Sequence, residues 1–223
     1  MMRRLLILLL IPGLSLLILR ASGQTQGVLG KRFIDNWSVG LGGGPNIFFG
    51  DLKEKEFLPV TSEMNELKFG GTFTLTRQLS HVFAIRGQLL YSEISGTKRE
   101  YSGGSPCNEY FIGNIIEGNI NTTINFSNLF SSRYKPKRKF FVYGTLGLGI
   151  SNWITTVKNL KTDEIKRKSN ENDQWRSAPV AMGGIGAYYN FGDKVNLGIE
   201  WNLHGVNSDY VDATKGIYRY DAY

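Results

Sequence analysis

Four ionisable residues lie on the polar side of four different segments that share a two-residue period: Lys68, Arg86, Glu117 and Glu200. Two bases and two acids enclosed in one interior have to pair, because a buried charge without a partner is strongly unfavourable. The sequence therefore predicts an internal ion network made of these four residues.

A histidine and a serine near the end of the sequence could do nucleophilic chemistry. His204 stands four residues before Ser208, and a nucleophile beside a base is the minimum for covalent catalysis. No compact His-x-Ser signature is present, and the two-residue period places His204 on the inward, polar side. We therefore expect no catalytic residue, and keep His204 and Ser208 as an alternative site.

Other chemical motifs are missing from the sequence. No phosphate-binding loop, dinucleotide fingerprint, zinc-ligand spacing or nucleophile elbow occurs, so we expect no cofactor and no metal. Asp209 and Asp212 without a glycine-defined loop are a weak calcium signal. The single Cys107 excludes an intramolecular disulfide.

The elements that must position these residues are β-strands. In residues 195–204, five apolar side chains alternate strictly with polar residues and glycine, which is typical of a strand with two unlike faces. Similar alternation predicts six further strands, and an eighth is expected at 216–223, short or missing in this sequence. The six lie at 37–42, 67–76, 83–92, 116–128, 140–153 and 179–191.

The predicted connections alternate in length. Long polar segments at 51–64, 96–111 and 158–176 read as loops, whereas the intervening connections near 78–80, 131–139 and 192–193 are short. This alternation is typical of outer-membrane barrels, which have short periplasmic turns and long extracellular loops. The interior of a barrel of about eight strands is just wide enough to be filled by side chains. We therefore favour a sealed polar interior over a gated pore.

The N-terminus has the three parts of a secretory signal peptide: basic residues at 1–4, an apolar run at 5–19, and small residues at 21–23. We predict a signal peptide at 1–23, a short leader at 24–34 and one barrel domain at 35–223. The formal net charge of +7 falls to +4 without the three arginines of the signal peptide, which does not suggest a nucleic-acid partner.

Together with the signal peptide, three short stretches carry a resemblance to a family: WSVGLGGG at 37–44, NFGD at 190–193 and NSDYVD at 207–212. Over roughly residues 35–223 the chain resembles the small eight-stranded outer-membrane barrels of the OmpA-like superfamily. The resemblance implies an all-β fold, an antiparallel up-and-down transmembrane β-barrel in the outer membrane of a Gram-negative envelope. Its members have roles in envelope tethering, in adhesion or in larger assemblies.

The function that we expect is structural or binding, through extracellular loops and without catalysis. Residues 158–176 carry six bases and four acids, and their cations could hold lipopolysaccharide phosphates. The expected partners are outer-membrane lipid and lipopolysaccharide, with envelope proteins as further candidates. Two alternatives stay open: an outer-membrane lipid-modifying hydrolase using His204, and a soluble secreted lipocalin-like binding barrel. The position of the charged residues distinguishes the two barrels: they lie inside a membrane barrel and on the outer surface of a soluble one.

Overall fold

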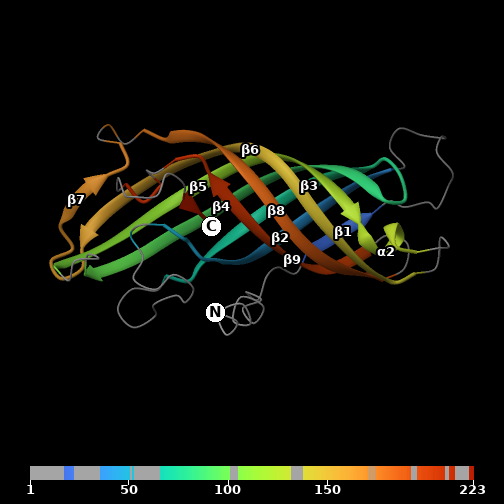
Figure 1. Ribbon diagram of the computed structural model, residues 1–223, viewed down its shortest axis with the longest axis horizontal. Helices are drawn as coiled ribbons and strands as arrows, with labels where there is room; N and C mark the ends of the chain where they lie inside the picture. Colours follow the sequence, from blue (N-terminus) through green and yellow to red (C-terminus); the bar gives the residue numbers. More distant parts are fainter. Residues whose placement is uncertain are drawn as a thin grey trace.

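The computed structural model shows an elongated barrel of long antiparallel strands (Figure 1). The residues that it describes are 18–22, 36–50, 52, 66–100, 105–131, 138–170, 172, 174–191, 195–208, 211–213 and 221–223.

Seven long strands make most of the wall, and each one pairs antiparallel with the next along the chain. This confirms the predicted all-β, up-and-down architecture and the seven predicted strands, although the strand expected at 116–128 ends at Asn125. They are β2 (Trp37–Asn46), β3 (Lys68–Gln78), β4 (Phe83–Glu100), β5 (Pro106–Asn125), β6 (Phe140–Asn159), β8 (Arg176–Phe191) and β9 (Val195–Val206). One short helix, α2 (Phe126–Leu129), follows β5. Among the described residues, no helix is long and apolar enough to cross a membrane.

The position between β9 and β2 is occupied only at its two ends, by two short strands. At one end, β10 (Asp221–Ala222) pairs with β9. At the other end, β1 (Ile18–Ser22) pairs with both β9 and β2. Between them, the facing edges of β9 at 199–203 and of β2 at 42–46 have no paired strand in the part of the chain that the structure describes.

The two ends of the sequence thus differ from their expected roles. The eighth strand expected at 216–223 is represented only by β10, and 214–220 lie outside the described residues. β1 comes from within the predicted signal peptide, although that segment was expected to lie outside the fold. The rest of the signal peptide and the leader at 24–34 lie outside the described residues, so both assignments stay predictions.

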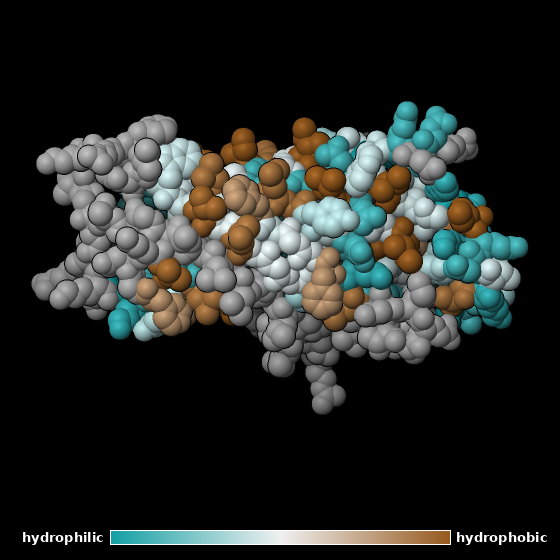
Figure 2. All heavy atoms as spheres, turned by 180° about the vertical axis from the view of Figure 1, so that it is seen from behind, coloured by the Kyte–Doolittle hydropathy of each residue, from teal (hydrophilic) through white to brown (hydrophobic). Residues whose placement is uncertain are grey.

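Side chains alternate between the barrel interior and its outer surface. The outward positions in the middle of the wall are apolar, and Ile120 on β5 and Leu148 on β6 are each 72% exposed. The inward positions at the same level are polar and buried, and Arg86 and Glu117 have no exposed surface. Figure 2 shows the apolar residues over the middle of the wall and hydrophilic residues gathered toward one end.

Three strands are about twice as long as a membrane crossing needs. β4, β5 and β6 have 18, 20 and 20 residues, whereas a tilted strand spans the bilayer with about 9–11. A short strand, β7 (Ile165–Lys168), pairs with the far part of β6. We use the name head for residues 93–100 of β4, 106–115 of β5 and 152–168. The last range contains the end of β6, the turn that follows it and β7.

The head corrects the predicted loops. Residues 96–111 and the first part of 158–176 were expected to be loops, but β4 runs to Glu100, β5 starts at Pro106, and β6 continues into a turn and β7. Strand pairing thus continues where the simple pattern of apolar and polar positions is lost.

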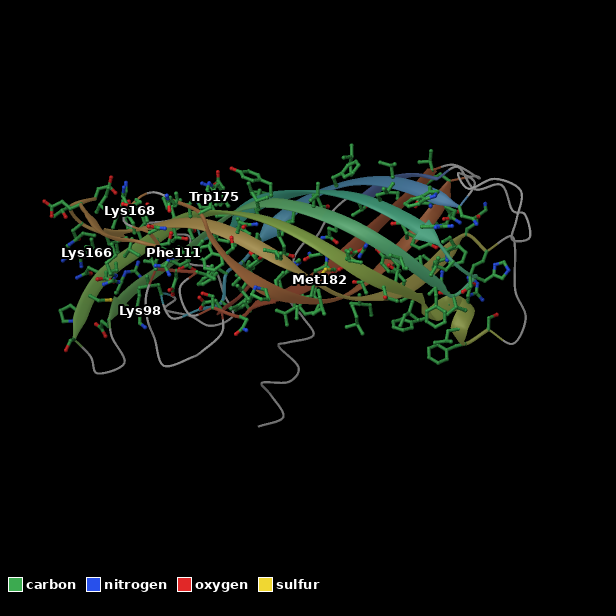
Figure 3. All side chains as sticks on the ribbon, turned by 90° about the horizontal axis from the view of Figure 1, so that it is seen from above. Lys98, Phe111, Lys166, Lys168, Trp175 and Met182 are labelled. Atoms are coloured by element: carbon green, nitrogen blue, oxygen red, sulfur yellow. The ribbon has the colours of Figure 1, made fainter. Side chains whose placement is uncertain are left out.

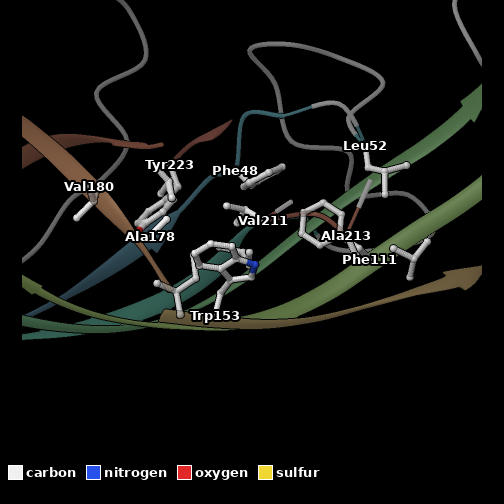
Figure 4. Packing of buried hydrophobic residues seen from close by; sticks show 13 residues of the cluster. Phe48, Leu52, Phe111, Trp153, Ala178, Val180, Val211, Ala213 and Tyr223 are labelled. Carbon is white, nitrogen blue, oxygen red and sulfur yellow. The ribbon is translucent and has the colours of Figure 1, made fainter. Parts of the chain in front are cut away.

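An apolar core lies inside the head. Trp153, Phe111 and Ile115 from the strands pack with Phe48 and Val211, which come from outside the long strands (Figure 4). The rings of Phe48 and Phe111 meet edge to face with centroids 4.9 Å apart. This core fills the space between the head strands and the segments that follow β2 and β9.

Candidate functional site

One acid-centred cluster crosses the interior between strands that are not neighbours. Arg86 on β4 donates two hydrogen bonds to Glu200 on β9, from Nη1 to Oε2 at 2.7 Å and from Nη2 to Oε1 at 2.8 Å. The Tyr143 hydroxyl donates to the same Oε2, and Asn202 Nδ2 donates to Oε1 at 2.9 Å. Such a two-pronged arginine–carboxylate pair is among the strongest and most directional in proteins.

A second cluster surrounds the other buried acid on the side nearer the head. His204 Nδ1 lies 2.6 Å from Oε1 of Glu117, and Asn119 and Tyr223 also donate to this carboxylate. The Tyr223 hydroxyl is 2.9 Å from Ser151 Oγ. The rings of His204 and Tyr223 stack with centroids 5.2 Å apart. The carboxylate is thus held by donors from three segments of the chain.

The interior around these clusters is tightly filled. A Cβ added at Gly147 or Gly149 on β6 would overlap the side-chain amides of Asn121 and Asn119. Glycine at these inward positions lets asparagines from β5 lie across the interior. The two clusters and these asparagines therefore occupy the interior at this level of the wall.

The structure brings together two of the four residues of the predicted ion network. Arg86 and Glu200 are in direct contact, whereas Glu117 is bound by His204 instead of by a lysine or arginine. Lys68 is placed differently: it stands at the first position of β3, its side chain is 21% exposed, and its Nζ lies 4.0 Å from Oε2 of Glu93. Its position at the end of a strand keeps it out of the central clusters.

Sequence reasoning did not identify the uncharged members of these clusters. Tyr143 and Asn202 share the inward parity of their strands, so the alternation was a usable signal for them. Tyr223 offered no such signal, because the strand expected at 216–223 has no clear alternation from which its face could be assigned. Its backbone pairs with His204 through two hydrogen bonds, of 2.6 and 2.9 Å.

His204 and Ser208 occupy different surroundings. The His204 side chain faces the interior, buried and bound to Glu117. Ser208 lies beyond the end of β9, where its carbonyl oxygen accepts a hydrogen bond from the Asp221 amide at 3.2 Å. Among the described residues, no three His, Cys, Asp or Glu side chains are placed to hold a metal ion. Asp212 is buried and accepts the Leu52 amide at 2.8 Å, and Asp209 lies outside the described residues.

The head presents basic and aromatic side chains at the end of the molecule (Figure 3). On β7, Lys166 Nζ lies 3.2 Å from Oε1 of Glu109, and Arg167 binds the same carboxylate. Ile165 and Trp175 are 58% and 44% exposed. The described part of 158–176 is therefore an ordered basic edge beside a buried acid.

A second pair of head residues is linked by a proton-sensitive hydrogen bond. The Tyr110 hydroxyl donates to Asp163, and Lys158 Nζ lies 3.3 Å from Oδ2 of the same carboxylate. Burial, followed by the contact with Asp163, raises the pKa of Tyr110 to about 12. The hydrogen bond from Tyr110 and the contact with Lys158 lower the pKa of Asp163.

Comparison with known families agrees with this geometry. A family model described as an outer membrane protein beta-barrel domain matches residues 20–222, which is nearly the whole sequence. No curated protein matches the chain. An apolar outer wall around a buried polar interior is the arrangement that a barrel in a membrane requires. The chain therefore belongs to the family of outer-membrane β-barrel proteins.

Proposed function

We propose that this outer-membrane barrel is a sealed, non-catalytic protein whose head binds partners outside the cell. The observation that carries the proposal is the extension of β4, β5 and β6 beyond the apolar part of the wall, closed from within by the apolar core of the head. A structure built only to cross the membrane needs no such extension.

Two features support a sealed interior. The Arg86–Glu200 pair joins two strands that are not neighbours in the sheet, and the head core packs buried apolar side chains at one end. Ions would have to displace buried, hydrogen-bonded groups in order to pass, which is strongly unfavourable. A small barrel of this kind ordinarily has its interior filled by side chains.

The surroundings of His204 support a structural role over a catalytic one. Its Nδ1 is engaged by Glu117 and its ring is stacked on Tyr223. A lipid-modifying enzyme needs its histidine at the lipid-facing surface, where a substrate ester can reach it, and this histidine is 5% exposed inside the wall.

The apolar outer belt of the barrel argues against the other alternative, a soluble lipocalin-like cup. Ile120 and Leu148 on this belt are each 72% exposed, and exposed apolar surface of this extent marks a contact with lipid or protein.

The partner that the head best fits is an anionic one, and lipopolysaccharide is the abundant candidate at this surface. Lys166 and Lys168 on β7 lie with Lys98 toward the end of the head (Figure 3). Lysine and arginine bind phosphate through charge-assisted hydrogen bonds. Envelope proteins with an acidic surface would use the same side chains.

Two measurements test the proposal. In planar bilayers the purified chain should give no steady conductance steps, and regular single-channel steps would overturn the sealed interior. In vesicles with lipopolysaccharide, the double substitution Lys166→Gln and Lys168→Gln should weaken the binding of lipopolysaccharide to the head. Arg77→Gln, near the end of β3 opposite the head, is the matched control, and equal weakening by the control would remove the role of the head.

A further inference from the structure

The most exposed large apolar residue of the described chain lies at the end opposite the head. Phe130, directly after α2, is 81% exposed, and Leu129 at the end of α2 is 47% exposed. Both belong to the connection between β5 and β6, which loop length assigns to the periplasmic side. With Phe140, which is 55% exposed at the start of β6, they form an apolar surface at this end, and an exposed apolar patch marks a contact with lipid or protein.

The segment that presents Phe130 is held firmly. Asn125 caps α2 by accepting the Asn128 amide at 3.1 Å, and Asn128 Nδ2 donates to the His81 carbonyl at 2.7 Å. Ser127 Oγ accepts the Val142 amide of β6 at 2.8 Å. These bonds tie α2 both to β6 and to the neighbouring β3–β4 connection. The exposure of Phe130 is therefore a built feature of the fold.

α2 packs against the outer surface of the barrel. Gly144 occupies an outward position of β6, and a Cβ there would meet the Phe126 ring at 2.7 Å. Phe126 therefore covers Gly144 from outside, and its ring stacks on Phe130 with centroids 6.3 Å apart. The two rings continue the outward apolar row of β6, in which Phe140 and Leu146 are exposed. Phe130 thus stands at the lower rim of the lipid-facing belt.

Two cations lie beside these rings. Arg138 donates to the Ser127 carbonyl and, through Nη2, to Ser131 Oγ at 3.3 Å. Lys139 follows it, exposed, immediately before β6. A row of aromatic rings bordered by cations matches the chemistry of a bilayer interface, where acyl chains meet phosphate headgroups.

We propose that α2 with Leu129 and Phe130 is an interfacial foot that inserts into the periplasmic leaflet and contacts anionic phospholipid headgroups through Arg138 and Lys139. The foot continues the apolar outer belt of the barrel, so the membrane that covers the belt also contacts the foot. It fixes the depth at which the barrel sits, independently of what the head binds. A cation near an anionic surface contributes about fivefold in partitioning, so the headgroup contact is a secondary contribution beside the insertion of the rings.

Site-directed spin labelling of the full chain in vesicles tests the insertion. The buried Cys107 is the only cysteine in the sequence, so Cys107→Ser gives a background for single labels. A label at Leu129→Cys leaves Phe130 in place. Labels at Ile120→Cys in the outward belt and at Ile165→Cys on β7 mark the lipid and the water references.

The accessibility of each label to oxygen and to a water-soluble nickel complex gives its depth. The label at position 129 should lie between the two references, in the interfacial region. Adding Phe130→Ser should move it toward water, while heat-modifiability in gels reports that the barrel is still folded. A label at 129 that is as accessible to nickel as the one at 165 would overturn the foot and assign this surface to a soluble periplasmic protein.

The lipid headgroup is tested separately. In vesicles containing phosphatidylglycerol the label at 129 should lie deeper than in pure phosphatidylcholine, and Lys139→Gln should reduce this difference. Lys161→Gln, on the turn before β7, is the matched control and should leave the difference unchanged. The same depth in both lipids would overturn the contact with anionic headgroups.

Discussion

The head and the wall, by which we mean the part of the barrel outside the head, share the same strands. The side chains that point into the interior are polar in the wall and largely apolar in the head. On β5, the inward residues Glu117, Asn119 and Asn121 lie inside the wall, whereas the inward residues Phe111 and Ile115 lie inside the head. The two-residue alternation runs through both regions without a break. The solvent outside decides which face is apolar: lipid surrounds the wall, and water surrounds the head.

On β5 and β6 the change occurs within one to three residues. Ile115 is fully buried and points inward, and the next residue, Ile116, points outward and is exposed. On β6 the outward Ile150 is followed, three residues later, by the inward Trp153. Two apolar residues that are close in sequence but on opposite faces therefore mark the level at which the membrane ends.

The largest expected effect comes from the wall interior. Arg86→Ala should lower the free energy of unfolding by about 3–5 kcal/mol, because it leaves Glu200 buried without its cation. Adding Glu200→Gln should recover part of the loss, and a double-mutant cycle from urea unfolding in lipid vesicles measures that coupling. Glu117→Gln is the control, since Glu117 is bound by His204. Coupling of Arg86 to Glu117 as strong as to Glu200 would contradict the two separate clusters.

The second largest effect is expected for charged substitutions on the outer surface, where the wall and the head should differ in stability cost. Leu148→Arg places a charge on the lipid face of the wall and should cost about 2–4 kcal/mol near the bilayer midplane. Thr156→Arg lies on the same strand and the same face, but in the head, and should change stability by less than about 0.5 kcal/mol. Insertion into vesicles, followed by heat-modifiability, measures both. Equal costs would place Thr156 in the membrane and remove the boundary between wall and head.

A smaller effect is expected from neighbouring isoleucines at the boundary. Ile115→Val removes a methyl group from the core of the head and should cost about 0.5–1.5 kcal/mol. Ile116→Val faces lipid, where no cavity forms, and should cost less. Hydrogen exchange of the head amides would report the loss at Ile115 locally. The reverse ranking would mean that the head has no tightly packed core.

The sequence predicts the wall well because one rule, apolar outward and polar inward, holds along each wall strand. Arg86, Glu117 and Glu200 were placed in the interior by this rule. It could not choose the partners, because strand register decides which inward residues meet. Lys68 satisfies the alternation but stands at the end of its strand, so the rule alone could not assign it to the rim.

The head was missed for a related reason. On β5 and β6 the inward positions of the head hold Phe111, Ile115, Trp153 and Val157, so at the boundary buried apolar residues take over the parity that is polar in the wall. A search for one continuous alternation therefore ends at the boundary. β7 is harder still, since Ile165 is followed by three successive cations that show no period. Pairing with β6 orders it, and that partner is visible only in three dimensions.

The smallest expected effect is a titration confined to the head. In the folded head the pKa of Tyr110 is raised to about 12, so its contribution to stability is present below the ordinary tyrosine value and lost as the pH rises through 12. The pKa of Asp163 is lowered, so its contribution is lost only as the pH falls below the ordinary aspartate range. Neither residue belongs to the wall, so the titration of this pair reports on the head alone. The difference in absorbance at 295 nm between wild type and Tyr110→Phe isolates one tyrosine, and its midpoint should lie near 12. Asp163→Asn should move that midpoint downward, because the phenolate then forms without a carboxylate beside it. A midpoint at the ordinary tyrosine value in the wild type would mean that Tyr110 is solvated and that the outer face of the head is less ordered than the wall.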